Sequence, residues 1–141
     1  MEFSTQIAPV SKAARWTGYV LSTLPVLMLF MGSFMALSQN PQAVEGTQQM
    51  GYPAWEVVPI GLANLVCTIL YIIPQTSVLG AILLTGYLGG AVATHVRVEE
   101  PQFAIAIVFG VLIWGGLYLR DPRIRALIPL RKSLPKPTDN D

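Results

Sequence analysis

The chain has 141 residues, of which 52% are hydrophobic and only 12% are charged. Soluble domains carry roughly 25% charged residues, so this chain lacks the polar exterior that a soluble protein of its size needs. It has no basic stripe with interleaved aromatic residues, which excludes the usual nucleic-acid-binding surfaces. Its single cysteine, Cys67, excludes an internal disulfide. The length fits one compact bundle without a second domain.

The first span is predicted at residues 16–38, after a polar N-terminal segment at 1–15. No charged side chain lies in 16–38, and a helix of this length reaches about 34 Å, enough to cross a hydrocarbon core of about 30 Å. Pro25 lies inside the span and is expected to kink it. The alternative is a secretory signal peptide cleaved after Ser38, although the apolar run is longer than a usual signal core.

A hairpin of two further spans is predicted after a polar loop at residues 39–54, which is rich in turn formers. Residues 57–94 contain no Asp, Glu, Lys or Arg and are about twice as long as one span. Pro74 near their middle has no N–H to donate and disfavours helix in the residue before it. We therefore expect spans at about 55–73 and 77–96, joined by a short turn.

The last span is predicted at about residues 102–119, because Pro101 suits the first turn of a helix. Residues 120–141 predict a basic tail whose last ten or so residues are disordered. The predicted fold class is all-α. We expect an integral membrane four-helix bundle with up-down-up-down topology, formed by residues 16–119 and in contact with the lipid bilayer.

The cations predict the orientation. With four spans, the two termini and the 74–77 turn share one side of the membrane. Eight of the nine Lys and Arg residues lie on that side, and only Arg97 lies on the other. The positive-inside rule therefore predicts a multi-pass protein of the cell (inner) membrane with both termini in the cytoplasm.

Span three contains a pattern of small residues. Gly86 and Gly90 form a small-xxx-small pair that Thr94 continues, and Gly89 widens the smooth surface. Lipid gives helices little hydrophobic reason to associate, so small residues that let backbones approach are typical of helix contacts. The pattern predicts packing within the bundle, and the alternative is a contact face of a homo-oligomer.

Several motifs follow one another along the last three spans: Gly51-Tyr52-Pro53, Ile60-Gly61, Ile73-Pro74-Gln75-Thr76, the run from Leu79 through Gly90 to His95-x-Arg97, and Tyr118-Leu119-Arg120-Asp121. Together they resemble the DoxX-like family of small four-helix membrane proteins, over most of residues 20–131. The chain departs from many relatives, which carry Lys near Ala36, Glu near Asn64 and Arg at Gln75. We therefore assign this chain no role that depends on a Lys–Glu pair between spans one and two.

The resemblance implies a function linked to quinone redox chemistry. Relatives include small subunits linked to thiosulfate:quinone oxidoreduction and partners in membrane oxidoreductase complexes. It implies an accessory subunit of a quinone-linked redox assembly, with a membrane or soluble oxidoreductase as partner and a quinone as ligand. The alternatives are a small-molecule permease or carrier, and a purely structural membrane subunit without a ligand. The sequence does not indicate an enzyme that acts alone.

Polar side chains near the ends of spans two and three that face away from the cytoplasm form the candidate site. Polar groups are costly inside a membrane, and those that occur there commonly serve a function. The predicted ligand-binding residues are Glu56, Asn64, Tyr87, Thr94, His95 and Arg97. Tyr87, Ala91 and His95 share one helix face. His95 could exchange protons near neutral pH, with Glu56 holding its imidazole.

The alternative is an interfacial Glu–His–Arg cluster that only anchors helix ends among lipid headgroups. One histidine cannot supply both ligands of a bis-His haem site. No second nitrogen or thiolate ligand has the spacing of a zinc site. The sequence therefore predicts no metal site, no visible cofactor motif and no catalytic residue.

Overall fold

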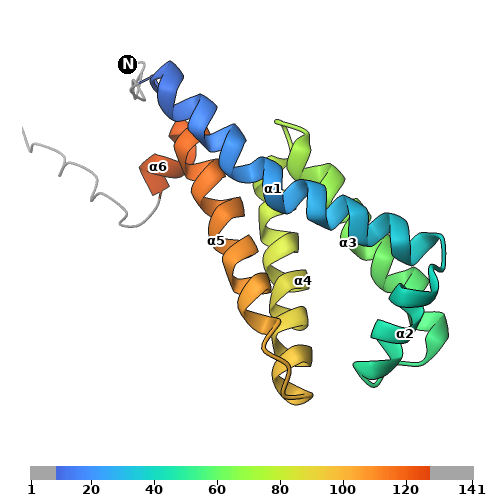
Figure 1. The fold of residues 1–141 in the computed structure, drawn as a ribbon. Coiled ribbons are helices and arrows are strands. Elements are labelled where there is room, and N and C mark those ends of the chain that lie inside the picture. The colour runs from blue at the N-terminus through green and yellow to red at the C-terminus, as the bar shows by residue number, and fades with distance from the viewer. Residues whose placement is uncertain (1–8, 128–141) are drawn as a thin grey trace, which may run out of the picture.

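The computed structural model describes residues 9–127, and within this range the only regular elements are helices (Figure 1). Four long helices carry the fold: α1 (Lys12–Leu37), α3 (Val57–Ile72), α4 (Ser77–Arg97) and α5 (Phe103–Arg120). Each is long and apolar enough to cross a membrane, α3 together with the 3-10 turn η1 (Ala54–Glu56) before it. The predicted all-α four-helix bundle is confirmed, and the chain is a multi-pass membrane protein.

Helix α1 begins four residues before the predicted start of span one. The Ser11 hydroxyl accepts a hydrogen bond from the Ala14 N–H at 3.2 Å and so caps the helix. The remaining three spans begin and end within a residue or two of the predicted positions. Their ends were predictable because charged and turn-forming residues bound each apolar run.

The predicted loop at 39–54 is largely wrong, because it contains helix α2 (Pro41–Gln49). Asn40 caps α2 by accepting from the Gln42 N–H at 3.0 Å, and Pro41 occupies the first helical turn. A further short helix, α6 (Pro122–Leu127), opens the predicted tail. The predicted disorder of the last ten or so residues lies outside the described residues, as do residues 1–8.

The four long helices form an open bundle. Helix α1 packs against α5 and α3, and α4 likewise packs against α5 and α3. Figure 1 shows that α1 and α3 run together toward α2, whereas α4 and α5 run together in a different direction. The two pairs therefore diverge toward the end that carries α2.

Small residues let α1 approach both of its neighbours. A Cβ built at Gly18 would lie 2.6 Å from the Gly116 carbonyl oxygen, and one built at Gly61 would collide with Ala36. Gly80 plays the same part where α4 meets the last turn of α3. Backbone contacts of this kind are how helices associate in lipid. Helix α1 supplies one side of two such contacts.

The glycines that the sequence singled out in span three do not mediate these contacts. A Cβ built at Gly86, Gly89 or Gly90 would meet no atom within 4 Å in the described part of the chain, and all three residues are exposed. The prediction that they pack against another helix of the bundle is therefore wrong. The alternative, contact with a second copy, stays a prediction.

Hydrogen bonds between helices supplement the small-residue contacts. The Tyr71 hydroxyl donates to the Ile113 carbonyl at 2.9 Å and lies 2.7 Å from the Ser22 hydroxyl, which joins α3 to α5 and α1. The Asn64 amide donates to the Leu29 carbonyl at 3.0 Å. Polar groups in the hydrocarbon layer must find partners inside the protein, and these bonds fix α3 against α1.

Candidate functional site

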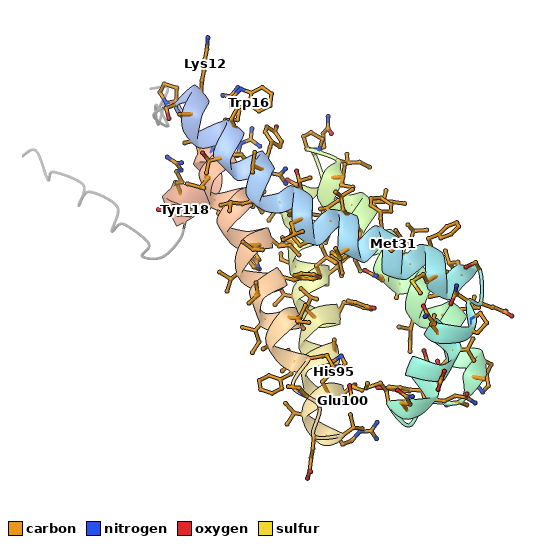
Figure 2. All side chains as sticks on the ribbon, in the orientation of Figure 1. Lys12, Trp16, Met31, His95, Glu100 and Tyr118 are labelled. Carbon is orange, nitrogen blue, oxygen red and sulfur yellow. The ribbon has the colours of Figure 1, made fainter. Side chains whose placement is uncertain are left out.

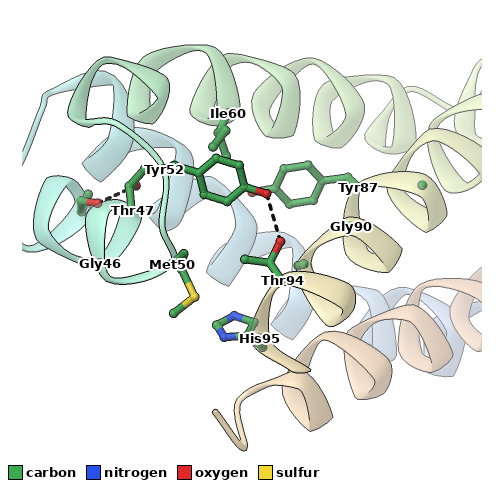
Figure 3. Close-up of a pocket in the computed structure, with 12 residues that line it drawn as sticks. Gly46, Thr47, Met50, Tyr52, Ile60, Tyr87, Gly90, Thr94 and His95 are labelled. Carbon is green, nitrogen blue, oxygen red and sulfur yellow. Dashed lines mark hydrogen bonds between the residues drawn. The ribbon is translucent and has the colours of Figure 1, made fainter. Parts of the chain in front are cut away.

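A cavity of about 530 Å³ lies between α2, the start of α3 and the second half of α4, where the helix pairs diverge (Figure 3). Its volume falls within the roughly 300–1,000 Å³ that small-molecule sites occupy. Small and apolar side chains line most of it, and a few polar groups are added. The lining residues are Ala43, Gly46, Thr47, Met50, Tyr52, Ile60, Gly86, Tyr87, Gly90, Ala91, Thr94 and His95.

Helix α4 supplies one wall of the cavity. Tyr87, Ala91 and His95 lie on it at successive turns of one helix face, as their spacing predicts. Gly86 and Gly90 complete the wall, and their missing side chains leave the space open. Within the bundle, the small-residue pattern of α4 therefore shapes a cavity and does not seat another helix.

The imidazole of His95 is held by a carboxylate from the loop after α4. Its Nδ1 lies 3.3 Å from Glu100 Oε2, and both side chains are half-buried. The Glu100 N–H also donates to the His95 carbonyl at 2.9 Å, so the chain folds back over the end of α4. The prediction that Glu56 holds this ring is wrong, since Glu100 takes that place.

Three interactions join the rim of the cavity across the gap. The guanidinium of Arg97 donates to the Met50 carbonyl and lies 5.9 Å from the centre of the Tyr52 ring. The Tyr52 hydroxyl lies 3.1 Å from that of Thr94, a bond drawn in Figure 3. Gly51 has a φ of +84°, which a residue with a side chain rarely adopts. This turn places the loop against Arg97.

A comparison with known families places the chain that forms this cavity. The model of the DoxX-like family matches residues 20–116. The chain belongs to the DoxX-like family. The match runs from α1 into α5 and covers the whole cavity, whereas the part of the earlier resemblance beyond residue 116 lies outside it. No curated protein and no solved structure matches this DoxX-like chain.

The DoxX-like bundle brings together only part of the predicted site. Three of the six candidates line the cavity: Tyr87, Thr94 and His95. Arg97 lies at the rim. Asn64 is only 4% exposed and bonds to α1, so it serves the packing of the bundle. Glu56 closes η1 and does not line the cavity.

The sequence analysis does not predict the second wall of the DoxX-like cavity, because the turn formers in residues 39–54 indicate a loop. Four residues of α2 and its end face the cavity at i, i+3, i+4 and i+7 spacing: Ala43, Gly46, Thr47 and Met50. Tyr52 and Ile60 complete this wall. The Asn-Pro pair at 40–41 is a standard helix start, and it was the signal that could have revealed α2.

Proposed function

We propose that this DoxX-like protein binds an amphipathic ligand, a quinone headgroup, in the cavity between α2 and α4. In this proposal it serves as an accessory subunit of a quinone-linked redox assembly. The observation that carries the proposal is a mostly apolar cavity of about 530 Å³ that also presents an imidazole and hydroxyl groups. A flat ring with polar oxygens at its edges needs this combination of surfaces.

The polar groups lie at one end of the apolar wall. His95 and Thr94 come from the last turns of α4, and Tyr52 reaches Thr94 from the loop after α2. Gly86, Gly90 and Ala91 extend the wall away from them with little side-chain bulk, and the ring of Tyr87 lies on the same wall. A ring could bond at the polar end while an isoprenoid chain follows the small residues toward lipid.

The chain's own residues can hold a ring oxygen and handle one proton. With Nδ1 directed at Glu100, Nε2 is the nitrogen of His95 that remains for a ligand. A neutral ring with its proton on Nδ1 accepts at Nε2, and an imidazolium donates there. Electrons would be supplied by an oxidoreductase partner, which the accessory role requires.

The test is the affinity for a short-chain ubiquinone analogue, measured by isothermal titration calorimetry in detergent. We expect His95→Asn to weaken binding about tenfold, because one hydrogen bond to a charged or polarised group is lost.

The matched control is Glu99→Gln, which changes an exposed neighbour in the same loop that does not line the cavity. It should leave the affinity unchanged. Equal affinities for wild type, control and His95→Asn would overturn the proposal in favour of a structural membrane subunit. Release of the analogue across a vesicle membrane by the purified protein would favour a carrier instead.

The cation distribution supports an orientation with both termini in the cytoplasm and the cavity facing outward. Figure 2 places Lys12 and Trp16 at one end of the bundle and His95 and Glu100 at the other. A phosphatase that is active only outside the cytoplasm should be active when inserted after Gln49 and silent when fused after Asp141. The reverse pattern of activity would contradict the proposed orientation.

A further inference from the structure

A second polar feature lies at the opposite end of the bundle, around the last residue of α5. The guanidinium of Arg120 lies 4.9 Å from the centre of the Tyr71 ring and 5.2 Å from that of Tyr19. Its carbon chain passes Gly18 of α1, whose missing side chain makes room for it. The aromatic faces hold the cation between α1 and α3, yet they accept no hydrogen bond in the plane of the guanidinium.

One nitrogen of this guanidinium lacks an acceptor. The Nη2 atom of Arg120 is buried and has no hydrogen-bond partner among the described residues. The adjacent Asp121 does not serve it, because its carboxylate caps α6 through the Arg123 N–H at 2.9 Å. An unpaired, buried charged donor is costly. An acceptor from another molecule would remove that cost.

Two clefts meet at Arg120, with volumes of about 240 Å³ and 130 Å³, and Tyr19 and Ile72 line both. The larger cleft begins at Arg120 and the hydroxyls of Ser22 and Thr23. It continues between α1 and α3 along apolar side chains, of which Leu27 is 60% exposed and Ile72 43% exposed. One end of the cleft therefore suits an anionic oxygen, and the other suits a hydrocarbon chain.

The surroundings place Arg120 at the depth of lipid headgroups. Trp16 is 71% exposed and Tyr19 46% exposed, as expected of aromatic residues at a membrane interface. The described charges at this end are mostly positive: Lys12, Arg15, Arg120, Arg123 and Arg125, against Asp121 alone. Basic pockets between membrane helices are known to bind anionic headgroups.

We propose that the cleft between α1 and α3 binds an anionic phospholipid, with its phosphate at Arg120 and an acyl chain along Leu27 and Ile72. This site lies at the opposite end of the bundle from the cavity at His95 and is independent of the quinone proposal. The phosphate supplies the acceptor that the buried guanidinium nitrogen lacks. The bound lipid would also fill the cleft between α1 and α3.

The experiment is native mass spectrometry of the purified full chain, titrated with phosphatidylglycerol and, separately, with phosphatidylcholine. We expect phosphatidylglycerol to bind more tightly, and Arg120→Gln to weaken its binding about tenfold, as expected for the loss of a charge-assisted hydrogen bond. Arg123→Gln is the matched control, since it removes the same charge from an exposed position nearby. It should weaken binding much less.

A second variant keeps the charge and fills the cleft. Ile72→Trp should also weaken phosphatidylglycerol binding about tenfold, because the acyl chain loses its place along α3. Equal losses in Arg120→Gln and Arg123→Gln, with none in Ile72→Trp, would reduce the effect to general surface charge and overturn the proposal. Displacement of bound phosphatidylglycerol by millimolar inorganic phosphate would instead assign the site to free anions and overturn it too.

Discussion

Replacement of Gly80 by alanine is expected to destabilise the bundle by about 3 kcal/mol, at the upper end of the usual cost of overpacking. A Cβ at Gly80 would lie 2.6 Å from the Leu70 carbonyl carbon and closer still to backbone atoms of Tyr71. Backbone atoms cannot turn aside as a flexible side chain can. The α3–α4 hairpin would have to open at its turn, where both helices are most closely joined.

The measurement is the apparent melting temperature of the purified protein in detergent. It is followed by size-exclusion chromatography after heating, as the loss of the monodisperse peak. Gly86→Ala is the matched control on the same helix, because a Cβ there would meet no atom within 4 Å in the described chain. It should melt like the wild type or slightly above it. If Gly80→Ala melts like Gly86→Ala, the close contact between α3 and α4 does not exist as described.

The spans could be predicted because they depend on length and charge alone. The run at 57–94 is too long for one crossing of the bilayer, and Pro74 supplies the break. These are one-dimensional properties, and the four candidate spans follow them closely. Contacts between helices could not be predicted in the same way, since they depend on which faces meet.

The site was predicted only where neighbours in space are neighbours on one helix. Tyr87, Ala91 and His95 line the cavity together because helical spacing places them on one face. The partner of His95 was predicted from helix ends as Glu56, but the loop after α4 folds back and brings Glu100 to the ring at 3.3 Å. Helical spacing does not predict this contact, because Glu100 lies beyond the end of α4, where the path of the loop decides which side chains meet.

The small-residue pattern of α4 illustrates the same limit. A small-xxx-small pair indicates that something can approach the backbone closely, and it does not say what. In this bundle the close helix contacts use Gly18, Gly61 and Gly80, whereas Gly86 and Gly90 line the cavity. The sequence cannot separate these two uses, because the difference lies in how far the helix pairs diverge.

Replacement of Gly90 by leucine is therefore expected to abolish ligand binding without destabilising the bundle. Nothing in the described chain lies within 4 Å of a Cβ at this position, so the added side chain enters the cavity. Helix propensity also favours leucine over glycine, by roughly 0.8 kcal/mol in helix interiors. We expect the melting temperature to stay the same or rise slightly, while the affinity for the short-chain ubiquinone analogue falls at least about tenfold, through loss of the space that the ring would occupy.

Gly89→Leu is the matched control, because Gly89 is the adjacent glycine, is equally open and does not line the cavity. It should leave the affinity unchanged, and its melting temperature should stay the same or rise slightly, as in Gly90→Leu. A large loss of stability in Gly90→Leu, accompanied by a change from dimer to monomer in light scattering, would show that a second copy packs on this face. In that case the glycines of α4 serve oligomerisation, and the cavity is an interface between copies of the chain.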